Sequence, residues 1–564
     1  MAASRVSAWV ATSRFWVIVR RRFPWLATAV ALTLVASLLV ATPASAVVEP
    51  DGLPVGAKEA PGRSGEGAAQ PLPPSSTEDS QGRRGPGLPD KQAKPRREPK
   101  LARPRDPVAV EAGLLVAPTG NRVSAVKEAR RTGRPVEDEA ARTPTSTELV
   151  NPDGSVTRVL YMDTAFVPDP ESGGLRPVST VLEQESDGYW APEAASESRF
   201  APSADADVLA SVALPDQRGR VGFSMAGAAK AAGVIPEGSD GTRLHYPGVF
   251  PDTDLFVSAT PEGVKDELVL ASPAAPTSFT FPLDLPAGVT PQARDDGSVE
   301  LVDARGTTVA VVQPGFMYDS SVDPRHGGPA ISTNVTYTVE RTDAGPRAKG
   351  AAGAGVAGRA RPGWVLRMDV DEQWLADPAR VWPVTIDPYL KTHVTGQDDL
   401  FVSSRDYAGV NTSAFPDLTI GTYDWGGEKA AAYLHFDLSG LAGKAVTGGT
   451  LKLYNYWSFS CTKSQAWVYE VTQNWSGQAY SWPGPSYNTS AISVAEFANG
   501  YTNCPTQDWA TWTLPISNVQ AWVDNPSNFK GLTVRASTTD ALGWKRFRSY
   551  DYSYTSKRPR LEVT

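Results

Sequence analysis

Hydrophobic and polar residues alternate with a period of two over much of the chain after residue 145, the pattern of half-buried β-strands. In "ELVNPDGSVTRVLYM", two such runs flank Asn151-Pro152-Asp153-Gly154, whose residue types suit a tight hairpin turn. Two further strand pairs follow in "DTDLFVSATPEGVKDELVL" and "DDGSVELVDARGTTVAVV". No amphipathic pattern of helix length interrupts them, so residues 146–390 are predicted to form a β-rich domain.

The composition changes at Lys391, although the strand pattern continues to Thr564. Nine of the sixteen tryptophans lie in residues 391–564, where turn-forming residues separate short apolar runs at regular intervals. This spacing favours an antiparallel β-sandwich of the jelly-roll kind. The predicted fold class is therefore all-β, with a C-terminal sandwich at 391–564 preceded by the β-rich domain.

The first 46 residues have the three parts of an export signal. Arginines cluster before residue 23, an apolar run extends from Leu26 to Ala41, and Ala44-Ser45-Ala46 supplies a cleavage site of small residues. The run is too short for a membrane span, and no second run of about 18 apolar residues follows. Residues 1–46 are predicted to be a signal peptide, which implies a secreted, extracellular protein without a stable membrane span. "RRRFP" leaves both the general and the twin-arginine export routes open.

Residues 47–145 are rich in proline, glycine, serine and charged residues, and they contain too few aromatic residues to bury a core. They are predicted to be a disordered tether. Within this segment, "RVSAVKEARR" places Val123, Val126 and Ala129 at helical spacing, which predicts a short helix without a firm cap.

The net charge of −8 argues against a general nucleic-acid binder, because such proteins need a concentrated positive field. The only two cysteines, Cys461 and Cys504, both lie in the predicted sandwich. Export to an oxidising environment favours a disulfide between them, and two separate buried thiols are the alternative.

The alternation also predicts which side chains point away from the core. With the hydrophobic positions of "KAAAYLHFD", "TLKLYNY", "GLTVRAS" and "WKRFRS" turned inward, cations and rings of these strands point outward. A ring stacks on the apolar face of a pyranose and a cation pairs with a carboxylate, so the combination predicts an acidic-sugar site. The predicted ligand-binding residues are Lys429, Tyr433, Lys452, Tyr454, Arg535, Trp544, Arg546 and Arg548.

Two alternatives limit this assignment. Outer faces of sandwiches commonly carry such residues for general reasons, and some of the rings could pack against the preceding β domain. Most of the other tryptophans, Trp509 among them, fit a core pattern better, whereas Trp425 and Trp482 lie in Gly- and Pro-rich loops that could border a groove.

No catalytic motif emerges from the sequence. The four histidines lack metal-ligand spacing, and "GFSMAG" does not match the G-x-S-x-G pattern of hydrolases. Asp398, Asp399 and Asp406 offer ligands for a structural Ca²⁺, although surface aspartates in a turn explain them as well. We expect a noncatalytic protein without a catalytic cofactor.

Eight blocks of residues 391–564, in order, resemble one known family. They are "DLFVSSRD", "LTIG", "AAYLHFDLSGL", "GTLKLYN", "VYEVTQNW", "WATWTLPISNVQAWVDNP", "FKGLTVRAS" and "RFRSYD" with "RPRLEV". Together they resemble the DNRLRE domain, also called carbohydrate-binding module family 96. The family consists of β-sandwich sugar-binding modules whose ligands include uronate polymers, so the resemblance implies an acidic polysaccharide. The cysteine pair also resembles a feature of actinobacterial members.

The region before the sandwich, with "VNPDGS", "VKDELVL" and "RVWPVTIDPYL", is similar to the corresponding part of secreted Rhs-type YD-repeat proteins of actinobacteria. Two main functions follow. The first is a secreted carbohydrate-binding protein for acidic or cell-surface polysaccharide. The second is an N-terminal scaffold of an Rhs-type protein that docks protein or cell wall without sugar specificity. A polysaccharide lyase or hydrolase is a third hypothesis.

Overall fold

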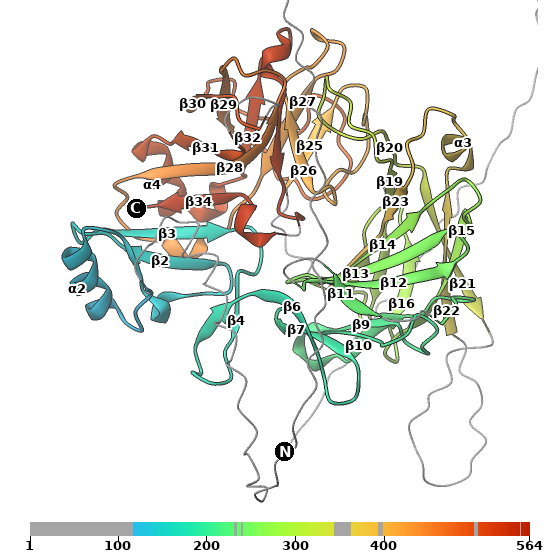
Figure 1. Ribbon diagram of the computed structural model, residues 1–564. Coiled ribbons are helices and arrows are strands. Elements are labelled where there is room, and N and C mark those ends of the chain that lie inside the picture. Colours follow the sequence, from blue (N-terminus) through green and yellow to red (C-terminus); the bar gives the residue numbers. More distant parts are fainter. Residues whose placement is uncertain are drawn as a thin grey trace, which may run out of the picture. The chain divides into compact units, whose positions relative to one another are not determined.

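The computed structural model describes residues 117–230, 234–237, 241–342, 363–392, 399–500, 506–552 and 554–564. The predicted signal peptide at 1–46 and most of the predicted tether lie outside these residues. Within them the chain is mostly β, with antiparallel sheets connected by turns and short helices (Figure 1). The predicted all-β class is confirmed.

Two sheets form the C-terminal sandwich. The first, here called the five-stranded sheet, has the order β25 (Asp399–Ser403), β27 (Ala430–Leu434), β32 (Leu532–Ala536), β29 (Ser464–Glu470) and β30 (Ser493–Phe497). The second, here called the β28 sheet, contains β26 (Asp417–Ile420), β33 (Lys545–Arg548), β28 (Gly449–Ser458), β34 (Arg560–Val563) and β31 (Asp508–Thr513). Inward residues of both sheets share one apolar core with helix α4 (Ile516–Asp524). Examples are Leu434, Leu453, Val534 and Phe547.

Residues 179–391 form two more sheets around a second apolar core. One has the order β21 (Val335–Thr342), β22 (Gly363–Val370), β15 (Ser278–Asp284), β10 (Arg220–Phe223), β9 (Ala210–Ala213), β8 (Ser198–Phe200), β7 (Trp190–Ala194) and β6 (Ser179–Gln184). The other has the order β11 (Ile235–Glu237), β12 (Arg243–Phe250), β13 (Thr253–Ala259), β14 (Gly263–Leu270), β24 (Tyr389–Lys391), β18 (Thr308–Val312), β17 (Val299–Val302) and β16 (Thr290–Ala293). Strands β19 (Phe316–Tyr318), β20 (Ile331–Ser332) and β23 (Val384–Asp387) join it, and α3 (Glu372–Leu375) precedes β23.

The three predicted hairpins are present as β2–β3, β13–β14 and β17–β18, with β2 at Ser146–Val150 and β3 at Val156–Tyr161. The β2–β3 turn needs Gly154, because its φ of 92° lies in a region that L-residues avoid. A separate short pair, β4 (Phe166–Pro168) and β5 (Leu175–Pro177), follows this hairpin.

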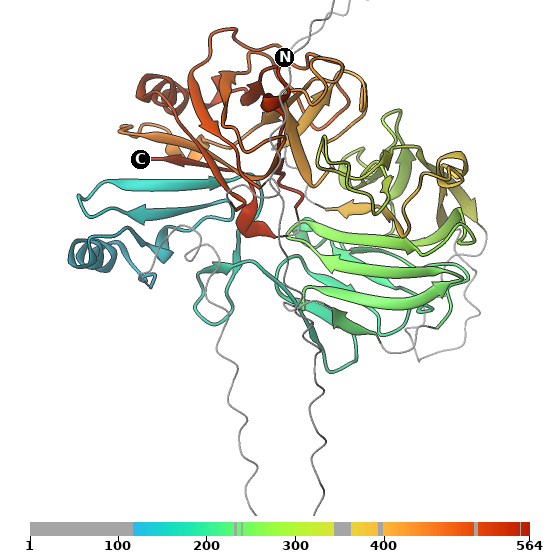
Figure 2. The same ribbon diagram turned by 45° about the horizontal axis from the view of Figure 1, so that its top comes forward.

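The first hairpin pairs with the end of the chain. Strand β3 lies antiparallel to β34, with Leu160 opposite Leu561 in the register. Both ribbon views show the cyan hairpin beside the red strand that ends at the C-terminus (Figures 1 and 2). Residues 146–161, which we expected to open the middle domain, therefore extend the β28 sheet. The predicted domain boundary at residue 390 remains a prediction.

The predicted tether is wrong for its last part. The described chain begins at residue 117 and forms helix α2 (Arg122–Thr132), followed by strand β1 (Val136–Glu137) paired with β2. The sequence predicted this helix but missed its cap, since the Asn121 side chain accepts a hydrogen bond from the Ser124 backbone N–H at 3.0 Å. Ala125 and Ala129 bury the helix against Val136 and Val150.

Candidate functional site

The predicted orientation of the strands is confirmed. Ala432 and Leu434 of β27 and Val534 of β32 point into the sandwich core. Tyr433 and Arg535 point to the opposite side of the five-stranded sheet. Whether these outward side chains meet solvent depends on what covers each face.

On the five-stranded sheet, the loop of residues 481–487 covers Tyr433 and Arg535. The Arg535 guanidinium donates hydrogen bonds to the Tyr433 hydroxyl and to the Pro483 carbonyl, the latter at 2.6 Å. The Tyr433 hydroxyl is also 2.8 Å from the Pro483 carbonyl. Tyr433 is fully buried and Arg535 is 8% exposed. The prediction that both side chains lie open to a ligand is wrong, because their polar atoms hold this loop against the sheet.

The same loop brings aromatic rings together above Arg535. Its guanidinium carbon lies 3.9 Å from the ring centroid of Tyr487 and 5.4 Å from that of Trp482. Tyr469 contacts Tyr487 edge to face at 5.5 Å. Trp467 is opposite Arg535 in the β29–β32 register, and these four rings are half-buried. We call the set the aromatic face; it consists of Trp467, Tyr469, Trp482 and Tyr487, with Tyr433 and Arg535 beneath them.

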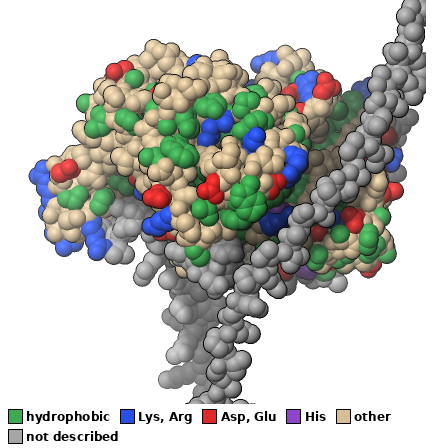
Figure 3. Space-filling view, turned by 90° about the horizontal axis from the view of Figure 1, so that it is seen from above, with side chains coloured by type: hydrophobic (Ala, Val, Ile, Leu, Met, Phe, Trp, Pro, Cys, Tyr) green, Lys and Arg blue, Asp and Glu red, His purple; other side chains and the backbone are tan. Residues whose placement is uncertain are grey.

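Figure 3 shows the molecule from above the view of Figure 1. The end that faces the reader is the one at which Figure 1 labels the strands of the five-stranded sheet. Hydrophobic side chains, among which aromatic rings are counted, gather there in several patches. A few basic side chains lie between the patches. This end of the molecule therefore presents more hydrophobic than basic side chains (Figure 3).

The outer side of the β28 sheet has a different chemistry. Lys557 lies 4.9 Å from the Tyr454 ring, and Tyr454 contacts Trp509 edge to face at 5.5 Å. Arg548 lies 3.6 Å from the Tyr456 ring and 4.1 Å from the Tyr552 ring. We call this set the basic–aromatic face; its members are Lys452, Tyr454, Trp509, Arg548, Tyr552, Tyr554, Lys557 and Arg560.

Three of the eight predicted residues, Lys452, Tyr454 and Arg548, thus share one face. Lys452 pairs with Glu562 at 2.7 Å, and Arg548 pairs with Asp417 at 2.8 Å. Lys557 has no ion-pair partner within the part of the chain that the structure describes. This face therefore offers partly exposed rings and a cation available to an incoming carboxylate.

The other members of this face were missed from the sequence. Trp509 was assigned to the core, although Ala510 and Trp512 of the same strand point inward and leave Trp509 on the outside. Tyr552, Tyr554 and Lys557 lie in the connection between β33 and β34, where Lys557 ends a short 3-10 helix (Thr555–Lys557) and no strand alternation indicates their direction. For Trp509 the parity of the strand was a usable signal.

Trp544 and Arg546 are buried, so their predicted role as exposed ligand contacts is wrong. The Trp544 indole N–H donates to the His326 carbonyl at 2.9 Å, and Trp544 packs in a cluster with Phe316 and Tyr423. Arg546 pairs with Asp417 at 2.9 Å. The middle region, residues 179–391, covers this end of the β28 sheet. This agrees with the alternative stated above, in which some of the rings pack against the preceding β domain.

Lys429, the remaining predicted residue, is half-buried just before β27 and belongs to neither face. It follows the turn of Trp425, whose side chain is 71% exposed. The Trp425 backbone has a φ of 56°, a left-handed conformation that is uncommon for a residue other than glycine.

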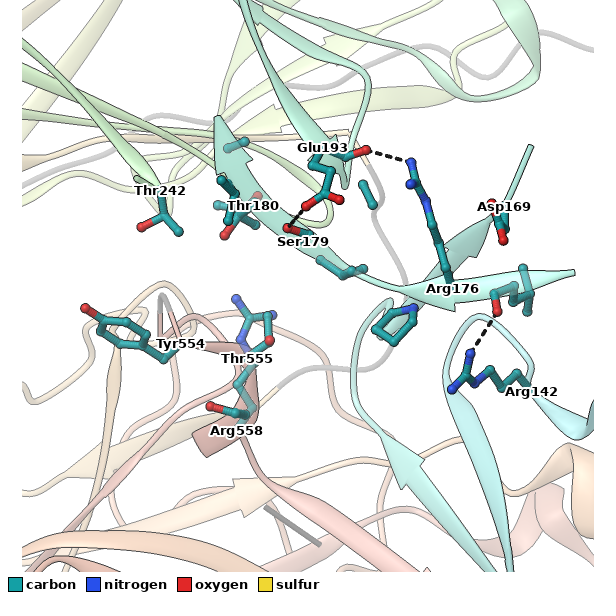
Figure 4. A pocket seen from close by; sticks show the side chains of 18 of the residues that line it. Arg142, Asp169, Arg176, Ser179, Thr180, Glu193, Thr242, Tyr554, Thr555 and Arg558 are labelled. Atoms are coloured by element: carbon teal, nitrogen blue, oxygen red, sulfur yellow. Dashed lines mark hydrogen bonds between the residues drawn. The ribbon is translucent and has the colours of Figure 1, made fainter. Parts of the chain in front are cut away.

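A cavity of about 1230 Å³ borders the basic–aromatic face. Figure 4 shows Tyr554, Thr555 and Arg558 on one side of it, across from Ser179, Thr180 and Thr242. The Tyr554 side chain is 51% exposed and belongs to both the cavity and the face. Most other charged groups of the wall are engaged within the protein; Arg176 donates to the Glu193 carbonyl at 2.7 Å, for example (Figure 4).

Other sequence predictions are answered only in part. Asp399 is buried and accepts a hydrogen bond from the Tyr550 backbone N–H at 2.9 Å, while Asp398 lies outside the described residues. Among the residues that the structure describes, no group of three or more His, Cys, Asp or Glu could hold a metal ion.

Cys504 also lies outside the described residues, so the Cys461–Cys504 disulfide remains a prediction. In the same residues, no helix has both the length and the hydropathy to cross a membrane.

An antiparallel sandwich that presents rings and cations on its outer faces has the construction of a carbohydrate-binding module. Residues 391–537 match carbohydrate-binding module family 96, a span that contains the whole five-stranded sheet and strands β26, β28 and β31. The match implies that the sandwich binds carbohydrate.

The chain is also similar to much longer curated proteins. It is 29% identical over 340 residues to the tRNA nuclease WapA of Bacillus subtilis (strain 168) and to the tRNA3(Ser)-specific nuclease WapA of Bacillus spizizenii. The alignment spans 58% of this chain but only 13% of each of these relatives. The similarity therefore relates this chain to a small part of WapA, a YD-repeat, Rhs-type protein.

Proposed function

We propose that this chain is an exported, noncatalytic carbohydrate-binding protein whose basic–aromatic face binds an acidic polysaccharide. The observation that carries the proposal is the position of Lys557, between the rings of Tyr454 and Tyr554 and without an ion-pair partner in the described part of the chain. The family match supports carbohydrate as the ligand class. The choice of an acidic polymer rests on the cations.

The chemistry of the face suits a uronate chain. Tyr454, Trp509 and Tyr554 present half-buried or exposed rings on which a pyranose can stack. Lys557 can pair with a carboxylate of the sugar directly. Lys452 and Arg548 already pair with Glu562 and Asp417, so a sugar carboxylate would have to share these cations with the two acidic side chains. An acidic polymer would therefore contact Lys557 first.

A second candidate function is an interaction scaffold. The alignment with WapA covers more than half of this chain, more than the family match covers, so the similarity extends beyond the residues that match the family. In this alternative, the sheets of residues 179–391 dock a protein or cell wall, and the sandwich contributes no sugar specificity.

The test is calorimetric titration of the mature protein with hexaguluronate at low and at high salt. Lys557→Gln removes the charge and shortens the side chain by one atom, and we expect roughly a 10- to 150-fold loss of affinity, since a hydrogen bond to a charged group contributes roughly 1.5 to 3 kcal/mol. Wild-type binding should weaken at high salt because screening reduces the attraction of exposed charges.

Lys463→Gln is the matched control, since Lys463 is an exposed lysine of the same sandwich outside this face. It should leave the affinity unchanged. Equal affinities of wild type and Lys557→Gln would contradict the assignment of the face. A wild-type protein that binds no acidic oligosaccharide at all would favour the scaffold.

A further inference from the structure

The aromatic face has the features of a binding surface but not those of an acidic-sugar site. Four half-buried rings, Trp467, Tyr469, Trp482 and Tyr487, share the outer side of the five-stranded sheet. All of these residues lie within the segment that matches the carbohydrate-binding family. The proposed function places no ligand on this side of the sandwich.

The cation of this face, Arg535, has little contact with solvent. Arg535 is the one cation of this face in the residues named above, and its Nη2 donates hydrogen bonds to the Tyr433 hydroxyl and the Pro483 carbonyl. It is 8% exposed and stacks under Tyr487. A carboxylate approaching this face would therefore have to give up hydration to reach a cation that is largely buried under rings.

Arg535 acts instead as a positioning residue. Together with Tyr433 it fixes the loop that carries Trp482 and Tyr487, so the two rings keep their place without a ligand. Gly484 lets this loop approach the sheet, because a Cβ at that position would lie 2.6 Å from the Tyr433 hydroxyl. Rings that are held in place before binding lose little conformational freedom when a ligand stacks on them.

We propose that the aromatic face is a second carbohydrate site that takes an uncharged pyranose polymer. Pyranose rings present apolar C–H faces that stack on aromatic side chains, and this interaction needs no charge. The two faces lie on the outer sides of opposite sheets, with the shared core between them. A neutral chain and an acidic chain can thus bind at the same time, and the sandwich can link two different polysaccharides.

The test uses the mature protein and three neutral probes, cellohexaose, mannohexaose and xylohexaose. At least one should bind with an affinity that salt does not change. Trp482→Ala should weaken that binding about tenfold, which is about 1.4 kcal/mol, because it removes a ring on which a pyranose stacks. Trp482→Phe should restore most of it. Hexaguluronate should bind the wild type and both variants equally.

Trp425→Ala is the matched control, since Trp425 is an exposed tryptophan of the same domain outside this face. It should leave neutral binding intact. Thermal unfolding of each variant shows whether the fold is retained, and Tyr487→Ala provides an independent change of the same face. The proposal is overturned if none of the neutral probes binds, if neither variant weakens binding, or if Trp482→Ala weakens only hexaguluronate. Loss of hexaguluronate binding in Lys557→Gln concerns the other face and leaves this test unaffected.

Discussion

At the scale of single residues, Lys545 shows how burial can override a side chain's preference for water. It shares the inward side of β33 with Phe547 and is fully buried. Its ammonium group donates to the Leu542 carbonyl at 2.7 Å. Burial lowers the pKa of Lys545 from 10.5 to about 8.

This shift predicts how Lys545 affects stability as pH changes. Below about pH 8 the group is charged in both the folded and the unfolded state, so folding has to bury a charge. Between about pH 8 and 10.5 the unfolded state binds more protons, and the contribution of Lys545 to the free energy of unfolding rises with pH. Lys545→Met should therefore stabilise the protein at pH 7 by about 1 to 3 kcal/mol.

Urea unfolding of wild type and Lys545→Met at pH 7 and at pH 10 measures this effect. The variant should be the more stable at pH 7, and the difference should shrink at pH 10. The Leu542 carbonyl keeps a partner in the variant, since the Ser464 hydroxyl also donates to it. Lys463→Met, at an exposed site, should show neither effect. A constant difference between the two pH values would mean that Lys545 titrates as it does in water.

At the scale of elements, the strand that completes the β28 sheet comes from far along the chain. Strand β3 pairs with β34, and Leu160 and Met162 enter the sandwich core. Without residues 117–162, β34 would expose an unpaired edge and the core would lose two apolar side chains. Free strand edges and uncovered apolar surface promote aggregation.

We therefore expect residues 391–564 alone to be less stable than residues 117–564. Thermal unfolding should show a lower midpoint for the shorter fragment, and light scattering should show more association. Within residues 117–564, Leu160→Ala should cost roughly 2 to 5 kcal/mol by leaving a cavity in the core. Fragments of equal stability would show that the hairpin only covers a sandwich that is already complete.

At the scale of the whole molecule, the middle region is held against the sandwich through close contacts. The Lys391 ammonium pairs with Asp551 at 2.7 Å, and Trp544 donates to the His326 carbonyl. Gly328 lies so close to the Arg546 guanidinium that a side chain at this position would collide with it.

Gly328→Ala should therefore weaken this contact by about 1 to 3 kcal/mol through overpacking. Calorimetry should show a lower unfolding midpoint, and limited proteolysis should cut residues 319–332 more rapidly. Gly120→Ala, where the added Cβ meets no atom within 4 Å, is the control. If Gly328→Ala behaves like this control, Arg546 can move aside and the contact tolerates the extra volume.

The sequence alone determined the fold class and the orientation of the strands. The period of two identified which residues of β27, β28, β32 and β33 point inward, and Phe547 lies in the core as expected. This succeeded because side-chain direction in a strand follows from local geometry. The export signal and the disulfide remain predictions, since residues 1–46 and Cys504 lie outside the described part of the chain.

Only the tertiary structure decided which outward side chains face solvent. Trp544 is covered by His326, which is 218 positions away in the chain, and Arg535 is covered by the loop of Pro483. Alternation distinguishes the two sides of a sheet, but it carries no information about a further layer that packs on the outer side. Seven of the eight predicted residues therefore divide between two surfaces and a buried contact, and Lys429 belongs to none of these. The surfaces differ in charge because distant segments neutralise or cover some cations and leave Lys557 unpaired among the described residues.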